Sequence, residues 1–130
     1  TINSHMEMLN GNIYDLNKKS PTIKLYQNNY LFDHSGNTGT GKSYIDLLLF
    51  DLTILGLTHL PFVIHDSFLF KNIEDSTVSN LVLRYDNFKK QIFIAIDGIQ
   101  KYSEVAQAIL KENTRLKLDN NHLLYGRDWR

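Results

Sequence analysis

The residues from Gly36 to Ser43 are the part of this sequence with the clearest potential for chemistry. They read Gly-Asn-Thr-Gly-Thr-Gly-Lys-Ser and match the phosphate-binding pattern G-x-x-x-x-G-K-[ST]. Glycines let a backbone approach a ligand closely, and successive N–H groups at the start of a helix can surround an anion. Lys42 could then reach a β- or γ-phosphate, and the Ser43 hydroxyl could bind Mg²⁺. The stretch predicts a nucleotide phosphate site; a glycine- and threonine-rich turn is the alternative.

The segment before these glycines does not match the setting of a P-loop. A P-loop follows a buried strand that runs straight into its first glycine. Here the apolar run Tyr30-Leu31-Phe32 stops three residues short, at Asp33-His34-Ser35. Ser35-Gly36 resembles instead the Ser-Gly-Gly opening of the signature motif of ABC-type ATPases, another glycine-rich turn that faces phosphate before a helix. In either interpretation the candidate phosphate-contacting residues are Ser35, Gly36, Gly39, Thr40, Gly41, Lys42 and Ser43.

The composition limits the class of protein. The 130 residues suffice for one domain with a core, and 42% hydrophobic with 22% charged residues is ordinary for a globular protein. Basic and acidic residues both number 14, so the zero net charge argues against a broad nucleic-acid surface. The absence of cysteine excludes disulfides and cysteine zinc sites and favours a reducing cytoplasm. We expect no membrane span, because the most apolar run, Leu47–Leu60, is short and contains Asp51.

The rest of the chain alternates between predicted helices and strands. Helices are expected over Ile2–Tyr14, Lys42–Gly56, Thr77–Phe88 and Ser103–Lys111. Two short strands or a hairpin are expected over Thr22–Phe32. Further strands are expected at Phe62–Ile64, Gln91–Asp97 and Thr114–Leu118, and a loop over Ser67–Asp75, with the tail from Leu123 packed back on the domain. This order predicts a three-layer α/β domain with a mostly parallel sheet, in which the strand at Phe62 is buried on both faces and the strand at Gln91 is central.

Acidic residues follow the two most apolar strands. Asp66 and Asp97 are expected at the carboxyl edge of the sheet, where α/β domains bind ligands. An acid at that edge, downstream of a phosphate loop, can hold the Mg²⁺ that bridges nucleotide phosphates, so Asp66 is the candidate metal ligand. The alternative is that Asp66 caps the following turn. His65 is interpreted as a packed histidine, because no second histidine lies at ligand spacing.

Together these blocks resemble the C-terminal half of the ATPase head of SMC-like and SbcC-type repair ATPases. They resemble more closely an uncharacterised C-terminal domain family attached to coiled-coil ATPases of bacterial ABC-three-component systems. In chain order, the matching blocks are the signature loop and helix at 35–57, the Walker B strand at Leu60–Ser67, the D-loop at Asn72–Asp75 and the switch-histidine strand at Gln91–Asp97.

The resemblance implies a cytoplasmic ATPase that binds ATP and Mg²⁺ between two heads and acts in DNA repair or defence. The nucleotide's own P-loop would lie in an N-terminal half of the head, and Gly36–Lys42 would contact the γ-phosphate of ATP held by a second head. The implied partners are that N-terminal half, the second head and, through the full-length protein, DNA. Residues 1–16 would be the end of a coiled-coil helix, unless Ser4-His5-Met6 is an expression-vector remnant, and residues 17–130 would be a single α/β domain that is inactive alone.

Two positions depart from the family pattern. Ser67 stands where the family has its catalytic glutamate after the Walker B acid, and Asp97 stands at the position of the switch histidine. Hydrolysis is therefore expected to be slow, or Asp97 or Glu74 positions the water instead. The candidate catalytic residues are Asp66, Asp97 and Glu74.

Three other functions are compatible with the sequence. One is an autonomous small P-loop NTPase or kinase, with its Walker A motif at residues 36–43 and its Walker B acid at Asp66. Another is a metal-dependent nuclease or Toprim-like domain, because clustered strand-end carboxylates such as Asp66, Glu74 and Asp97 suit two-metal chemistry. The third is a non-catalytic dimerisation module.

Overall fold

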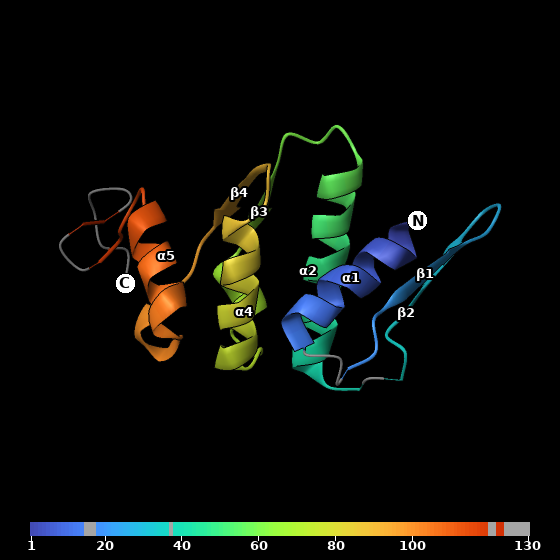
Figure 1. The fold of residues 1–130 in the computed structure, drawn as a ribbon, viewed down its shortest axis with the longest axis horizontal. Helices are drawn as coiled ribbons and strands as arrows, with labels where there is room; N and C mark the ends of the chain where they lie inside the picture. The colour runs from blue at the N-terminus through green and yellow to red at the C-terminus, as the bar shows by residue number, and fades with distance from the viewer. Residues whose placement is uncertain (15–17, 37, 120–121, 124–130) are drawn as a thin grey trace.

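The computed structural model describes residues 1–14, 18–36, 38–119 and 122–123. It is an α/β structure in which helices predominate (Figure 1). Its elements are α1 (Ile2–Tyr14), β1 (Thr22–Leu25), β2 (Tyr30–Asp33), α2 (Thr40–Leu57), β3 (Phe62–His65), α3 (Ser67–Phe70), α4 (Asp75–Asp86), β4 (Gln91–Ile94), the 3₁₀ turn η1 (Ile99–Lys101) and α5 (Glu104–Asn113). Within the described ranges, no helix combines the length and the apolar character that crossing a bilayer requires.

Helix α2 is at the centre of the hydrophobic core. Its apolar residues recur at helical spacing, and Ile45, Leu48 and Leu52 are fully buried. Helix α1 packs against α2 and α4, and α4 packs against α5. The predicted helix at Ile2–Tyr14 is confirmed, and its residues Leu9 and Ile13 are buried in this same core.

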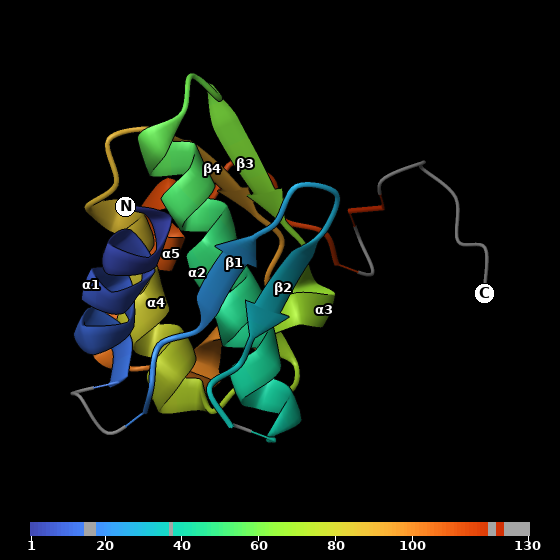
Figure 2. The same ribbon diagram turned by 90° about the vertical axis from the view of Figure 1, so that its right-hand side faces the viewer.

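Near its start, α1 is joined to the hairpin. The amide side chain of Asn3 makes two hydrogen bonds with the backbone of Ile23, at 2.8 and 3.0 Å. The predicted hairpin is confirmed: β1 and β2 pair antiparallel, with Leu25 opposite Tyr30. Figure 2 shows this hairpin lying over α2, where the rings of Phe32 and Phe50 meet edge to face at 5.7 Å. The base of the hairpin is therefore fixed to the core, whereas Leu25 and Tyr30 are exposed.

Strands β3 and β4 pair in parallel and form a sheet of two strands. The described residues thus form two small sheets, one parallel and one antiparallel, and not the expected three-layer domain with a mostly parallel sheet and a central strand at Gln91. The expected burial of β3 on both faces is wrong, because Phe62 and Ile64 are 48% and 67% exposed. The side chain of Phe93 on β4 is also half exposed and contacts Phe62. An apolar run predicts a strand but does not specify whether both of its faces are covered in this chain.

Two local predictions are also corrected by the structure. The segment after Asp66 is not all loop, because Ser67–Phe70 forms the single helical turn α3. Residues Thr114–Leu118 are not a strand: Leu116 and Leu118 alternate as in a strand, but both are exposed. An isolated bridge between Asp119 and His122 follows them. The tail predicted to pack back lies outside the described residues from position 124 onward.

Candidate functional site

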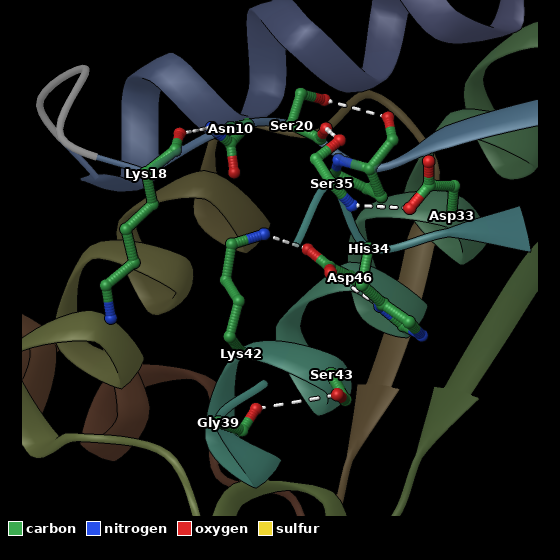
Figure 3. Close-up of polar contacts among 11 residues, drawn as sticks. Asn10, Lys18, Ser20, Asp33, His34, Ser35, Gly39, Lys42, Ser43 and Asp46 are labelled. Carbon is green, nitrogen blue, oxygen red and sulfur yellow. Dashed lines mark hydrogen bonds and ion pairs between the residues drawn. The ribbon is translucent and has the colours of Figure 1, made fainter. Parts of the chain in front are cut away.

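The glycine stretch leads directly into α2, as the sequence predicts. Ser35 and Gly36 both adopt left-handed backbone conformations, with φ of 56° and 78°. The Ser35 N–H donates to Asp33 at 2.8 Å, and its hydroxyl donates to the Ser20 carbonyl at 2.7 Å (Figure 3). Gly39 then precedes the first helical residue in an extended conformation. A left-handed turn tied to residue 20 therefore sets the direction in which the chain enters α2.

Lys42 points into the protein. It is 5% exposed, and its ammonium group forms an ion pair with Asp46 one helical turn later (Figure 3). Asp46 is fully buried, and its other carboxylate oxygen lies 2.7 Å from Nδ1 of His34. The Lys42 ammonium also lies 5.4 Å from the ring centroid of Tyr14 on α1. The lysine of the glycine motif thus neutralises a buried carboxylate in this structure.

Tyr14 experiences the same cluster of charges. Burial raises the pKa of its hydroxyl well above the usual range, and the carboxylates of Asp46 and Glu74 add to that effect. Glu74 immediately precedes α4. Charges on α2 (Asp46) and next to α4 (Glu74) therefore both act on Tyr14, at the end of α1. Tyr14 therefore keeps its proton at neutral pH.

Gly39 and Gly41 have different surroundings. A Cβ atom at Gly41 would lie 2.3 Å from the carbonyl oxygen of Asn72. A Cβ atom at Gly39 would have no neighbour within 4 Å. Gly41 is therefore required by packing against the backbone of the segment expected to be the D-loop, whereas Gly39 leaves open space above the helix start.

The candidate carboxylates are all exposed. Asp66 follows β3, and its Oδ1 accepts a hydrogen bond of 2.6 Å from the Ser67 N–H at the start of α3. The capping alternative is therefore observed for Asp66, and its exposed position still leaves the carboxylate accessible to a cation. Glu74 occupies the position before α4 and makes no capping hydrogen bond there. Asp97 lies three residues after β4, before Gly98, which has a φ of 57°.

These carboxylates do not form a ready-made metal cluster. Among the described residues, no group of three or more histidine and acidic side chains is arranged to hold a metal ion. A nuclease-like site with Asp66, Glu74 and Asp97 as joint ligands would therefore require a different arrangement. The phosphate, metal and catalytic assignments of all candidate residues remain predictions.

Sequence reasoning missed two polar contacts near the candidate site. The first is the buried ion pair between Lys42 and Asp46. The spacing of four residues between them in a predicted helix could have indicated this pair. The second concerns His65, which is 1% exposed and contacts Tyr85 and Asp51. His65 is thus a packed histidine, as interpreted, but one with polar partners on two helices.

Comparisons with known proteins define the family. A family described as uncharacterised and conserved in bacteria, DUF2326, matches residues 9–127, and the chain belongs to it. A solved structure from work on the structural biochemistry of ATP-driven dimerization and DNA-stimulated activation of SMC ATPases is similar in fold. The match has a TM-score of 0.52 and 14% identity, and it covers 83% of this chain and 71% of the other. No curated protein matches the chain.

Proposed function

We propose that this chain is the C-terminal half of an SMC-like ABC ATPase head and acts on ATP held between two heads. The glycine stretch would contact the γ-phosphate of ATP bound to a second head, and Asp66 would hold Mg²⁺. The bound metal ion would neutralise charge on the nucleotide phosphates. The full protein would act in the cytoplasm, in DNA repair or defence, with DNA as a partner of the complete molecule.

The incomplete parallel sheet is the observation that carries this proposal. Parallel sheets are normally covered on both faces, yet β3 and β4 leave Phe62, Ile64 and Phe93 about half exposed or more. Within the described residues this parallel sheet has two strands, and Asp66 follows one of them, β3. A further half that adds strands and covers this face would complete the domain. The similarity in fold to an SMC ATPase supports a head as the complete form.

The inward direction of Lys42 favours a signature-type loop over an autonomous P-loop. A P-loop lysine must reach the phosphates of its own nucleotide. Here the ammonium group is paired with the buried Asp46. If Lys42 turned toward a nucleotide, the buried carboxylate would lose this partner and keep its contact with His34. Gly39, with open space beside its backbone, fits the close approach of a phosphate better.

The two departures from the family pattern bear on the rate of hydrolysis. Ser67 cannot act as a general base in the way a glutamate can, so hydrolysis is slow unless Asp97 or Glu74 orients the water. Replacing Ser67 with Glu should raise the ATPase rate of the full protein. Loss of activity in Asp97→Ala would support a role for Asp97, and an unchanged rate would count against it.

The proposal can be tested by combining this chain with the ATP-binding half of the head and measuring their association by light scattering. We expect a complex, and we expect Mg-ATP to join two such complexes. Ile64→Asp should prevent the first step, because it places a charge on the exposed face of β3, whereas Val105→Asp, at an exposed apolar residue of α5, should not. Equal binding by both variants, or no complex with the wild-type chain, would refute the proposal.

A further inference from the structure

A chain of three polar side chains lies directly behind the strand end that carries Asp66. His65 is the last residue of β3 and is buried. Its Nδ1 lies 2.7 Å from the hydroxyl of Tyr85 on α4, and its Nε2 lies 3.4 Å from a carboxylate oxygen of Asp51 on α2. Two helices of the core therefore hold the ring of the residue that precedes Asp66.

The two ring nitrogens of His65 contact different partners, the Tyr85 hydroxyl and the Asp51 carboxylate. Burial, reinforced by the charge of Asp51, raises the pKa of Tyr85 well above its usual value, so its hydroxyl stays protonated. That hydroxyl can donate to Nδ1, and Nε2 on the other side of the ring faces Asp51. At 3.4 Å, this second contact is longer than an ordinary hydrogen bond and acts mainly through the charge of the carboxylate.

This arrangement does more than fill space at the end of β3. An apolar side chain would occupy the position without the cost of burying polar groups, and the residue on the same face two positions earlier is Val63. Side chains alternate along a strand, so the inward direction of His65 sets the direction in which the next residue, Asp66, leaves it. The His65 carbonyl also accepts a 3.0 Å hydrogen bond from the Ala95 N–H, next to β4. Side chain and backbone thus hold the same strand end.

We propose that Tyr85 and Asp51 orient His65, and that His65 is thereby a positioning residue for the metal-binding carboxylate of Asp66. The inference rests on the proposed function, because that function assigns Mg²⁺ to Asp66. None of the three residues would touch the ion. They would fix the backbone next to Asp66. Residues around a metal ligand generally set the orientation of that ligand in this way.

The positioning itself can be tested in this chain without nucleotide. Tyr85→Phe removes one hydroxyl and keeps the ring, and Tyr102→Phe is the matched control, because it removes the hydroxyl of a buried tyrosine elsewhere in the core. In amide NMR spectra, Tyr85→Phe should shift the signals of Asp66 and Ser67 and speed hydrogen exchange at Ala95 about tenfold, the change that loss of one ordinary hydrogen bond allows. The control should leave all three signals unchanged. Equal effects of both variants on these amides would overturn the inference.

The consequence for metal binding is measured in the full protein. Tyr85→Phe should raise the Mg²⁺ concentration needed for half-maximal ATP-dependent association of heads by about tenfold, as expected for a group behind a ligand. Asp66→Asn separates the two proposals. If Asp66→Asn abolishes the Mg²⁺-dependent association of heads but Tyr85→Phe leaves the half-maximal Mg²⁺ concentration at the wild-type value, this inference fails and the proposed function stands. If Asp66→Asn itself has no effect, the metal assignment of the proposed function fails, and the inference fails with it.

Discussion

A buried ammonium group is stable only beside a matching charge, and Lys42 has that charge in Asp46. Both side chains are almost inaccessible to solvent, so water can replace neither partner. His34 contacts the second oxygen of the same carboxylate. At this scale, Lys42 contributes to stability whatever its role toward a nucleotide, and a loss of ATP binding in a Lys42 variant must be separated from a loss of folding.

Replacing Asp46 should therefore destabilise the fold strongly. Asp46→Ala leaves the ammonium of Lys42 buried without its partner, which typically costs about 3–5 kcal/mol. Urea unfolding gives the change, with Asp86→Ala, at the exposed end of α4, as the control. The double variant Lys42→Met, Asp46→Leu should recover most of the loss. A loss below about 1 kcal/mol, the value typical of exposed pairs, would contradict the burial of this pair.

The two tyrosines with raised pKa values predict a loss of stability at alkaline pH. The pKa values of Tyr14 and Tyr85 are raised in the folded state from a usual value of 10.0. As pH rises above about 10, the unfolded chain releases these protons before the folded chain does, so the free energy of unfolding falls. Below that pH the contribution is fully present.

Urea titrations at increasing alkaline pH measure this effect. Replacing Tyr14 and Tyr85 with Phe should make the decline shallower, because the groups that release protons only on unfolding are gone. An equally steep decline in the double variant would show that other groups are responsible.

At the scale of elements, the start of α2 is fixed by its contact with the segment before α4. A Cβ at Gly41 would overlap the Asn72 carbonyl, whereas one at Gly39 would meet open space. Gly41→Ala should therefore cost about 1–3 kcal/mol, as overpacking usually does. Gly39→Ala should change stability by less than about 0.5 kcal/mol. Thermal unfolding of the two single variants compares them directly.

The same pair of variants separates packing from function. If the glycine stretch faces a phosphate, Gly39→Ala should weaken ATP-dependent association of heads although the protein is folded, because a methyl group would occupy the open space beside the backbone. A Gly39→Ala protein with unchanged stability and unchanged association would count against a phosphate at this position.

The helices could be predicted from the sequence because each one has an apolar stripe long enough to show its period. The prediction for α2, Lys42–Gly56, differs little from the observed Thr40–Leu57. The turn α3 has four residues and is too short to show a period. The alternating Leu116 and Leu118 suggested a strand, but no described strand pairs with that segment. Pairing depends on neighbours that are distant in the sequence.

The candidate site could be predicted only in part for the same reason. The glycines and the acid after the strand are local sequence patterns, and Asp66 does follow the end of β3 as predicted. The inward direction of Lys42 depends on Tyr14 and His34, which come from other elements of the fold. The role of His65 depends likewise on side chains from α2 and α4.

At the scale of the whole molecule, the helices form a buried core, whereas the parallel sheet of β3 and β4 has an uncovered face. The helices bury a continuous cluster around α2, whereas the outer face of β3 and β4 exposes large apolar side chains. Under the proposed function, this exposed apolar surface would be the site of contact with another chain. Under the proposed function, the complete nucleotide site would form only when another half of an ATPase head covers this face.

Calorimetry of Mg-ATP binding tests this central claim most directly. The chain alone, shown to be folded, should give no binding heat, and binding should appear when the ATP-binding half of the head is added. Stoichiometric binding by the chain alone, lost in a Lys42→Ala variant that remains folded, would contradict the account. It would mean that Gly36–Ser43 is a complete P-loop and that Lys42 leaves Asp46 to reach the nucleotide.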